Sequence, residues 1–197
     1  MMRAFLILLA LAAATTVRAE AASWTLDPVH TRIAFRVSHA GFSEAIGTFS
    51  GITGTLHFDP DDWRSARVEA RIPIERLELG DAKWRERILD PTFFGVKKHP
   101  EARFVSSRIE VLGDDRLRVH GRLALHGVEE DVALEARINR IARHPLTLRR
   151  TAGFSATTTL SRAAFGMKKW KNLVGDAVAV SIEVEAVRDR TPDEEKD

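Results

Sequence analysis

Apolar and polar residues alternate one by one along most of the chain. In the clearest stretch Ile33, Phe35 and Val37 alternate with Arg32 and Arg36, which gives an extended strand one dry face. Eight stretches show this pattern, at residues 32–39, 47–58, 67–74, 104–111, 116–126, 132–138, 153–161 and 178–184. The pattern predicts an all-β fold, an eight-stranded antiparallel barrel. A barrel of this strand number either fills itself with side chains or encloses one ligand.

One segment breaks the alternation. Trp84 and Ile88 stand four residues apart among charged residues, and Leu77 extends the same spacing. This periodicity predicts one short amphipathic helix over residues 80–90, packed alongside the barrel. Pro91 ends the helix because proline cannot continue its hydrogen-bond pattern.

Glycine and proline locate bends within the predicted strands. Gly47, Gly51 and Gly54 lie in a single alternating stretch and predict bulges or bends where the barrel curves. Pro73 lacks a backbone N–H, so it predicts the end of a strand or an edge position.

The N-terminus has the pattern of an export signal. Arg3 supplies the positive start, residues 5–14 form the apolar run, and residues 17–19 or 19–21 fit a small-x-small cleavage site. Residues 1–22 are therefore interpreted as a signal peptide. The run is short for a bilayer, which needs about 20 residues, but a retained membrane anchor stays open as the alternative.

Composition favours one exported domain. Residues 23–188 suit a single barrel domain, and residues 189–197 form a charged tail of the kind that is disordered. The chain has no cysteine, which excludes disulfides and thiol catalysis, and export without cysteine indicates a bacterial periplasm. Lys and Arg number 30 against 28 Asp and Glu, a near balance that argues against nucleic-acid binding.

Catalytic and metal-binding motifs find little support. Nothing in the sequence forms a Gly-x-Ser-x-Gly nucleophile elbow. The chain has seven histidines, and none forms a His-x-His pair or a His-Glu-x-x-His motif. We therefore expect no catalytic residue set and no metal site.

The aromatic residues point to a dry interior. The chain has ten Phe, four Trp and no Tyr, and rings without a hydroxyl suit an apolar lining. From spacing alone these rings either line a tunnel or fill a core. The residues expected to line a ligand cavity are Phe35, Val37, His39, Phe42, Phe49, Ile52, Leu56, Phe58, Phe94, Phe104, Phe154 and Phe165.

His39 is the one polar residue in that inner pattern, because it continues the parity of Ile33, Phe35 and Val37. A buried imidazole needs a hydrogen-bond partner. Two interpretations stay open. One is a core histidine bonded to the backbone of the nearby glycine turn, and the other is a contact for a ligand head group at the barrel mouth.

A second group of polar candidates follows the threonine-rich stretch. Arg162 ends that stretch, and Lys168, Lys169 and Lys171 surround Trp170. Cations beside an aromatic ring suit a phosphate or carboxylate, while a solvated loop around a tryptophan plug is the alternative. The head-group candidates are His39, Arg162, Lys168 and Trp170.

Five motifs occur in a fixed order. They are HAGF at 39–42, GTFSGI at 47–52, Phe93-Phe94 with KHP at 98–100, GRLALHGV at 121–128 and GFSATTTLSRAAFGM at 153–167. With them the chain resembles the YceI-like family of exported, polyisoprenoid-binding proteins over residues 24–187. One departure is Gly95, where the family commonly has an acidic residue.

The resemblance implies a lipocalin-like, eight-stranded barrel with an elongated apolar cavity for a long isoprenoid or another amphiphile, such as a fatty amide. It also implies roles in lipid carriage and stress response, an association with cytochrome b561-type membrane proteins, and homodimers in some members. The family has no established catalytic set, so no catalytic residue is carried over.

The sequence thus predicts a non-enzymatic periplasmic binding or carrier protein for a polyisoprenoid or similar long-chain lipid, with no cofactor. The alternative is an isoprenoid-quinone-handling enzyme or accessory partner of a cytochrome b561-type redox protein. A solid barrel that serves only as an interaction module is a third possibility.

Overall fold

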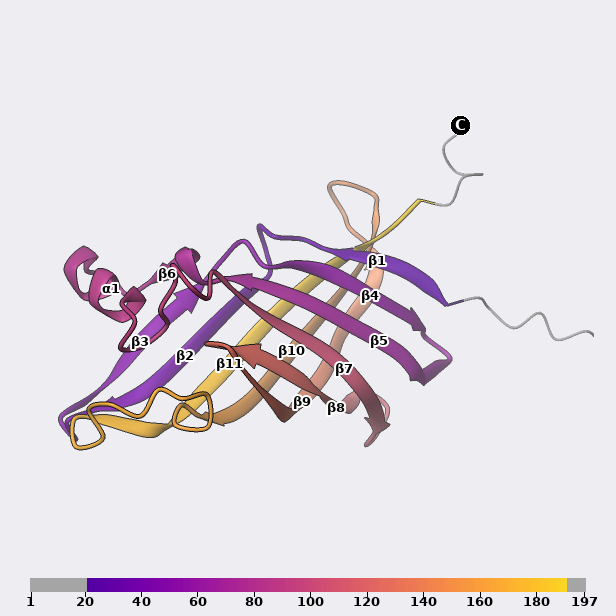
Figure 1. Cartoon of the computed structure of the whole chain (residues 1–197). Helices are drawn as coiled ribbons and strands as arrows, with labels where there is room; N and C mark the ends of the chain where they lie inside the picture. The colour runs from indigo at the N-terminus through magenta and orange to yellow at the C-terminus, as the bar shows by residue number, and fades with distance from the viewer. Residues whose placement is uncertain (1–20, 191–197) are drawn as a thin grey trace, which may run out of the picture.

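The computed structural model describes residues 21–190, which form one curved antiparallel sheet with a helix at one end (Figure 1). Its elements are β1 (Ala22–Leu26), β2 (Arg32–His39), β3 (Ser43–Phe49), β4 (Thr53–Asp59), β5 (Asp62–Pro73), the 3₁₀ turn η1 (Ile74–Arg76), β6 (Leu77–Glu78), α1 (Ala82–Leu89), β7 (Glu101–Val111), β8 (Arg116–Leu125), β9 (Val128–Arg143), β10 (Arg150–Ser161) and β11 (Val174–Arg188).

The eleven segments form eight barrel strands within the described range, because three pairs of segments each continue one strand. β2 and β1 both lie along β11, with Ile33 opposite Ile182 and Leu26 opposite Ala186. In the same way β3 continues into β4, and β5 continues through η1 into β6. Each strand pairs with its neighbours in sequence, and β1 closes the ring against β11. The prediction of a closed, eight-stranded antiparallel barrel is confirmed.

The main differences from the sequence prediction lie where the chain leaves the regular ladder. The expected strand 47–58 begins earlier, at Ser43, and residues 50–52 interrupt it. Gly51 has a φ of +67°, which glycine adopts without steric cost. Leu77 does not belong to the helix but lies in β6, fully buried. Pro73 ends β5, as predicted.

The two terminal predictions fall mostly outside the described residues. Of the predicted signal peptide, residues 1–20 lie outside them, and Ala22 already begins β1. Of the predicted tail, residues 191–197 lie outside them. Asp189 is tied to β1, since its N–H donates to the Ser23 carbonyl at 2.9 Å and its carboxylate accepts from Thr25 Oγ1 at 2.7 Å.

Helix α1 forms within the predicted range. Asp81 caps it, because its carboxylate accepts from the Trp84 N–H at 2.8 Å. Arg85 ties the helix to β6, since its Nε donates to the Leu77 carbonyl at 2.7 Å. Within residues 21–190 no helix is long and apolar enough to cross a bilayer.

The two ends of the barrel differ. The turns at 40–42, 126–127 and 162–173 lie at the end that carries α1, which we call the helix end (Figure 1). The turns at 112–115 and 144–149 lie at the opposite end, which we call the far end. This division follows from the up-and-down order of the strands.

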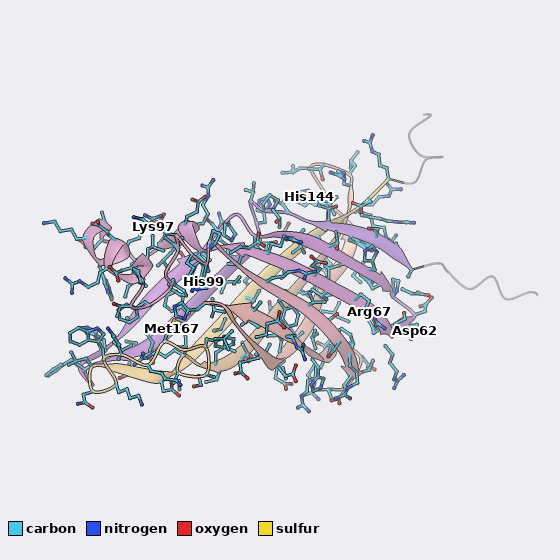
Figure 2. All side chains as sticks on the ribbon, viewed as in Figure 1. Asp62, Arg67, Lys97, His99, His144 and Met167 are labelled. Carbon is cyan, nitrogen blue, oxygen red and sulfur yellow. The ribbon has the colours of Figure 1, made fainter. Side chains whose placement is uncertain are left out.

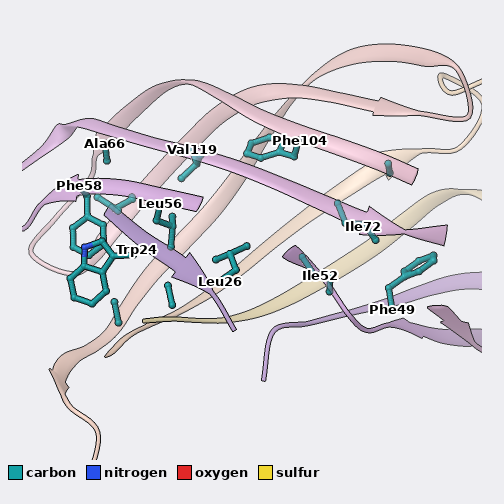
Figure 3. Close-up of a cluster of buried hydrophobic side chains, with 14 of the residues drawn as sticks. Trp24, Leu26, Phe49, Ile52, Leu56, Phe58, Ala66, Ile72, Phe104 and Val119 are labelled. Atoms are coloured by element: carbon teal, nitrogen blue, oxygen red, sulfur yellow. The ribbon is translucent and has the colours of Figure 1, made fainter. Parts of the chain in front are cut away.

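A stack of aromatic rings lies in the interior toward the far end, and Figure 3 shows two of its members, Trp24 and Phe58. The Phe58 ring is stacked between Trp24 and Trp63, with centroids 4.8 Å from each, and Phe154 meets Phe58 and Trp63 edge-on. Trp24 and Phe58 are each only 1% exposed. Each such pair contributes about 0.5–1.5 kcal/mol of stability beyond that from the area it buries. The stacked rings therefore stabilise this part of the barrel.

The stack makes a stability prediction. Trp24→Ala should lower the free energy of unfolding by about 3–5 kcal/mol, because it removes a large buried ring and leaves a void. Trp24→Phe should lower the free energy of unfolding much less, because the new ring can still stack on Phe58. It also removes the buried indole N–H, which has no hydrogen-bond partner among the described residues. Urea unfolding of both variants measures the difference, and equal losses would contradict the prediction.

Candidate functional site

The barrel encloses a cavity of about 1080 Å³. Its wall is formed by the inward residues of nearly every strand together with residues of α1 and the loop after it. Leu117, Val119, Leu123 and Leu125 of β8 all line it, as the alternation in that strand predicts. The volume lies at or above the upper end of the usual range for small-molecule sites, about 300–1,000 Å³. The interior is therefore a cavity and not a filled core.

Two glycines on the inner face let large rings lie against the wall. A Cβ at Gly47 would overlap the Phe35 ring, and a Cβ at Gly121 would overlap the Phe104 ring. Each glycine thus provides the space in which a neighbouring phenylalanine ring rests. The Phe35 and Phe104 rings are accommodated at the wall for this reason, and they line the cavity.

The structure brings together eleven of the twelve residues expected to line the cavity. They are Phe35, Val37, His39, Phe49, Ile52, Leu56, Phe58, Phe94, Phe104, Phe154 and Phe165. Phe42 was expected to belong to this set and does not. It lies in the turn between β2 and β3 and is 94% exposed, because the alternation of β2 stops where the chain turns back.

The cavity opens at the helix end. Every exposed residue of the lining belongs to the end of β2, to α1 and the residue after it, or to the turn 162–173. These residues are Ser38, His39, Lys83, Glu86, Arg87, Asp90, Trp170 and Leu173. Deeper in the wall the hydroxyls of Thr31 and Thr158 donate to backbone carbonyls of Glu185 and Ala133. The interior is therefore apolar, and the charged groups gather at the mouth.

Arg162 does not serve the role that the sequence suggested. Its side chain is 6% exposed. Its guanidinium donates to the carbonyls of Gly175, Lys169 and Val174 at 2.8 Å each, and also to that of Met167. Since most of its N–H groups already have backbone partners, Arg162 holds the turn 162–173 in place instead of offering a free cation to a head group.

The other head-group candidates lie around the mouth. His39 lines the cavity but is exposed, so it is not the buried core histidine that one interpretation required. Its ring lies 6.2 Å from that of Trp84 between centroids. Trp170 also lines the mouth, whereas Lys168 is exposed outside the lining.

Sequence reasoning missed the contribution of α1. Lys83 and Arg87 bring cations to the mouth, and Trp84 and Ile88 bring apolar surface. The helical spacing of Trp84 and Ile88 was a usable signal, because it shows that the helix has one apolar face that must pack against something. It did not show that the face covers the opening of a cavity.

A histidine pair lies beside the mouth but outside the lining. The rings of His99 and His126 meet edge-on with centroids 5.1 Å apart, and His126 Nδ1 lies 2.9 Å from the Phe165 carbonyl oxygen. Figure 2 shows His99 at the helix end, on the same side as Met167. Burial lowers the pKa of His99, and the nearby His126 and Lys98 lower it further.

One cluster of residue types that bind metals lies outside the cavity lining. The ligand atoms of Asp27, His30 and Glu185 fall within 4.8 Å of one another at the turn between β1 and β2. His30 Nδ1 lies 2.8 Å from Asp27 Oδ2, and this contact raises the pKa of His30. The contact between His30 and Asp27 is enough to explain why these side chains lie together.

Comparison with known proteins agrees with this geometry. The sequence model of the YceI-like domain matches residues 24–186. A UPF0312 protein of Pseudomonas putida is 31% identical over 88% of this chain and 90% of its own length. A UPF0312 protein of Pseudomonas savastanoi is 33% identical over 77% of this chain and 79% of its own length.

Solved structures share the fold. BcnA of Burkholderia cenocepacia superposes with a TM-score of 0.70 at 23% identity, over 79% of this chain and 95% of its own. A polyisoprenoid-binding domain from Saccharophagus degradans superposes with a TM-score of 0.67 at 14% identity, over 86% of this chain and 100% of its own.

The role of Arg162 is testable by hydrogen exchange. Arg162→Gln should lower the free energy of unfolding by about 2–4 kcal/mol, because one buried and three part-buried carbonyls lose a charged donor. The amides of Met167 and Val174, which donate within this region, should exchange faster than in the parent protein. Lys168→Gln, which changes an exposed cation of the same turn, should shift stability by less than about 0.5 kcal/mol.

The two perturbed histidines should respond to pH in opposite directions. The pKa of His99 is lowered, so its stabilising contribution is present above its unfolded-state value near 6.5 and is lost as the pH falls below it. The pKa of His30 is raised, so its contribution is present below 6.5 and is lost as the pH rises through the folded-state value. Imidazole NMR titrations measure both pKa values, and His99→Gln should flatten the acid side of the stability curve.

Proposed function

The chain belongs to the YceI-like domain family, and from this premise we propose that its cavity binds a polyisoprenoid or a similar long-chain lipid. The observation that carries the proposal is the form of the cavity. It is large, its deep wall is apolar, it reaches the aromatic rings of Phe58, Trp63 and Phe154, and its charged groups lie at the opposite end. A ligand with one polar head and a long apolar tail matches that distribution.

Burial of the tail supplies the driving force. An isoprenoid chain has no polar groups along its length, and each buried CH₂-sized group gains about 0.8 kcal/mol before costs. Large ligands retain far less, about 0.3 kcal/mol per heavy atom. Several five-carbon units are therefore enough for tight binding, while the apolar wall selects by length and girth and not by functional group.

The mouth sets the orientation of the ligand. With the tail in the apolar interior, a head group lies near the end of β2 and α1, where Lys83, Arg87 and His39 are exposed. Lys83 and Arg87 favour an anionic head such as a phosphate. Glu86 and Asp90 belong to the same stretch, so the mouth also has acceptors for a neutral polar head.

The family comparison supports a lipid ligand, because one structural neighbour is itself described as a polyisoprenoid-binding domain. The apolar run at residues 5–14 supports export, and we propose that the protein acts in the periplasm as a lipid carrier. We propose binding without catalysis, since the lining offers exposed polar groups only at the mouth.

A cavity-filling variant tests the proposal. Ala136 lines the cavity on β9, and Ala136→Phe should displace at least one five-carbon unit. At about 0.3 kcal/mol per heavy atom this weakens uptake of polyprenyl phosphate by about tenfold. Ala179→Phe is the matched control, because Ala179 is exposed on β11 and lies outside the lining.

The readout is native mass spectrometry of protein purified without detergent, followed by titration with polyprenyl phosphates of several lengths. Bound lipid in the parent protein and in Ala179→Phe, with a loss in Ala136→Phe, is the expected result. Uptake that is equal in all three proteins, or absent from the parent, would falsify the proposal.

A further inference from the structure

The mouth of the cavity has an exposed apolar rim. Phe42 is 94% exposed, Trp170 is 54% exposed and Leu173 is 46% exposed. The first comes from the turn between β2 and β3, and the other two come from the turn 162–173. We call these three residues the rim. Large apolar side chains exposed together on a protein surface mark a site of interaction.

The rim is built on a fixed base. The Ala40 N–H donates to the Leu173 carbonyl at 2.6 Å, which joins the two turns. Arg162 binds carbonyls of the turn 162–173 from inside, as described above. Trp170 has a φ of +60°, a conformation that costs a bulky residue energy, and its carbonyl accepts from Leu173 and Val174. The structure therefore holds the backbone at Trp170 in a costly conformation, and the side chain is 54% exposed there.

Positive charge lies on one side of the rim, on the turn 162–173. Lys168, Lys169 and Lys171 are exposed on the same turn, and residues 162–173 contain no Asp or Glu. The carboxylates at this end are Glu44 on β3, Asp176 on β11, and Glu86 and Asp90, which line the same mouth on α1 and just after it. Asp176 is engaged by the Ser161 hydroxyl at 2.7 Å and the Ala163 N–H at 2.9 Å. The turn 162–173, which carries two of the three rim residues, is thus complementary to anions.

The rim is also continuous with the cavity. Trp170 and Leu173 are exposed to solvent and line the cavity at the same time. A lipid that leaves the cavity at this point therefore passes over apolar side chains before it meets water.

We propose that the rim docks on an anionic lipid bilayer, so that the mouth of the cavity faces the apolar layer of the membrane. Tryptophan favours the bilayer interface, where its amphipathic ring lies at the level of the head groups. Exposed lysines near an anionic surface gain about 1 kcal/mol each. Phe42, which projects from the turn beside them, adds apolar surface for insertion.

The far end provides an internal comparison. Leu146 and Leu148 are 87% and 65% exposed in the turn between β9 and β10, with Arg143, Arg149 and Arg150 nearby in the sequence. This patch resembles the rim in composition, but neither leucine lines the cavity. Of these two apolar patches among the described residues, the rim is the one that is continuous with the cavity, and for that reason we assign docking to the rim.

The inference goes beyond the proposed function, because docking needs no lipid in the cavity. The test is co-sedimentation of the exported protein with lipid vesicles, after mass spectrometry has established its processed N-terminus. One set of vesicles contains phosphatidylcholine alone, and the other contains equimolar phosphatidylcholine and phosphatidylglycerol. We expect binding to the anionic vesicles, weaker binding to the neutral ones, and a decrease as salt is added.

Variants locate the contact. Lys168→Gln/Lys169→Gln/Lys171→Gln should weaken binding to anionic vesicles by about 100-fold, since each lysine contributes about a fivefold effect. Phe42→Ser should weaken it by about tenfold. Leu146→Ser/Leu148→Ser is the matched control and should bind like the parent protein. Ala136→Phe should also dock normally, which separates docking from occupancy of the cavity.

Several results would overturn the proposal. It fails if the lysine and Phe42 variants bind vesicles as tightly as the parent, or if the leucine control is the variant that loses binding. It also fails if the parent does not bind vesicles but sediments as a dimer that Phe42→Ser dissociates, because the rim would then contact a second copy of the chain.

Discussion

The architecture depends on one constraint: the inward side chains must cover the barrel wall without meeting across the axis. An unbroken ring of strand pairing, closed by β1 against β11, keeps the wall from collapsing inward. Glycine at positions 47 and 121 then lets phenylalanine rings rest on the wall. Protein interiors are normally close-packed, so a void of about 1080 Å³ persists only because the surrounding ladder fixes its shape.

The two ends of the cavity differ in the polarity of their side chains, so the cavity favours one orientation of a ligand. Toward the far end, the lining includes the rings stacked around Phe58, and the Thr31 hydroxyl there donates to a backbone carbonyl. At the helix end, α1 and the end of β2 bring charged and polar side chains to the opening. A two-ended ligand therefore has one favourable orientation, and the same end presents the exposed apolar rim.

Arg162 links the interior of the fold to this surface. A cation buried beside an apolar cavity would be costly without partners, and here the turn 162–173 and the start of β11 supply them as carbonyl dipoles. The turn is held by a charge that the ligand does not need to satisfy. Its exposed lysines and Trp170 remain available at the surface, which explains why residues close together in the sequence have such different roles.

The sequence by itself determined the strands, the helix and the inward face of each strand, because alternation with a period of two is a local property. Eleven of the twelve residues expected to line the cavity do line it; eight of them lie in strands, where alternation applies, and Ile52, Phe94 and Phe165 lie in connecting segments. The tertiary structure alone decided the exposure and the contacts of residues at the ends of the strands, where the regular strand pairing stops. Phe42 turns outward, His39 becomes exposed, and the donors of Arg162 find carbonyls up to 13 residues away. It also decided that the axis stays open. The barrel closes by pairing β1 with β11, more than 150 residues apart in the chain, and no local pattern records the distance between opposite walls.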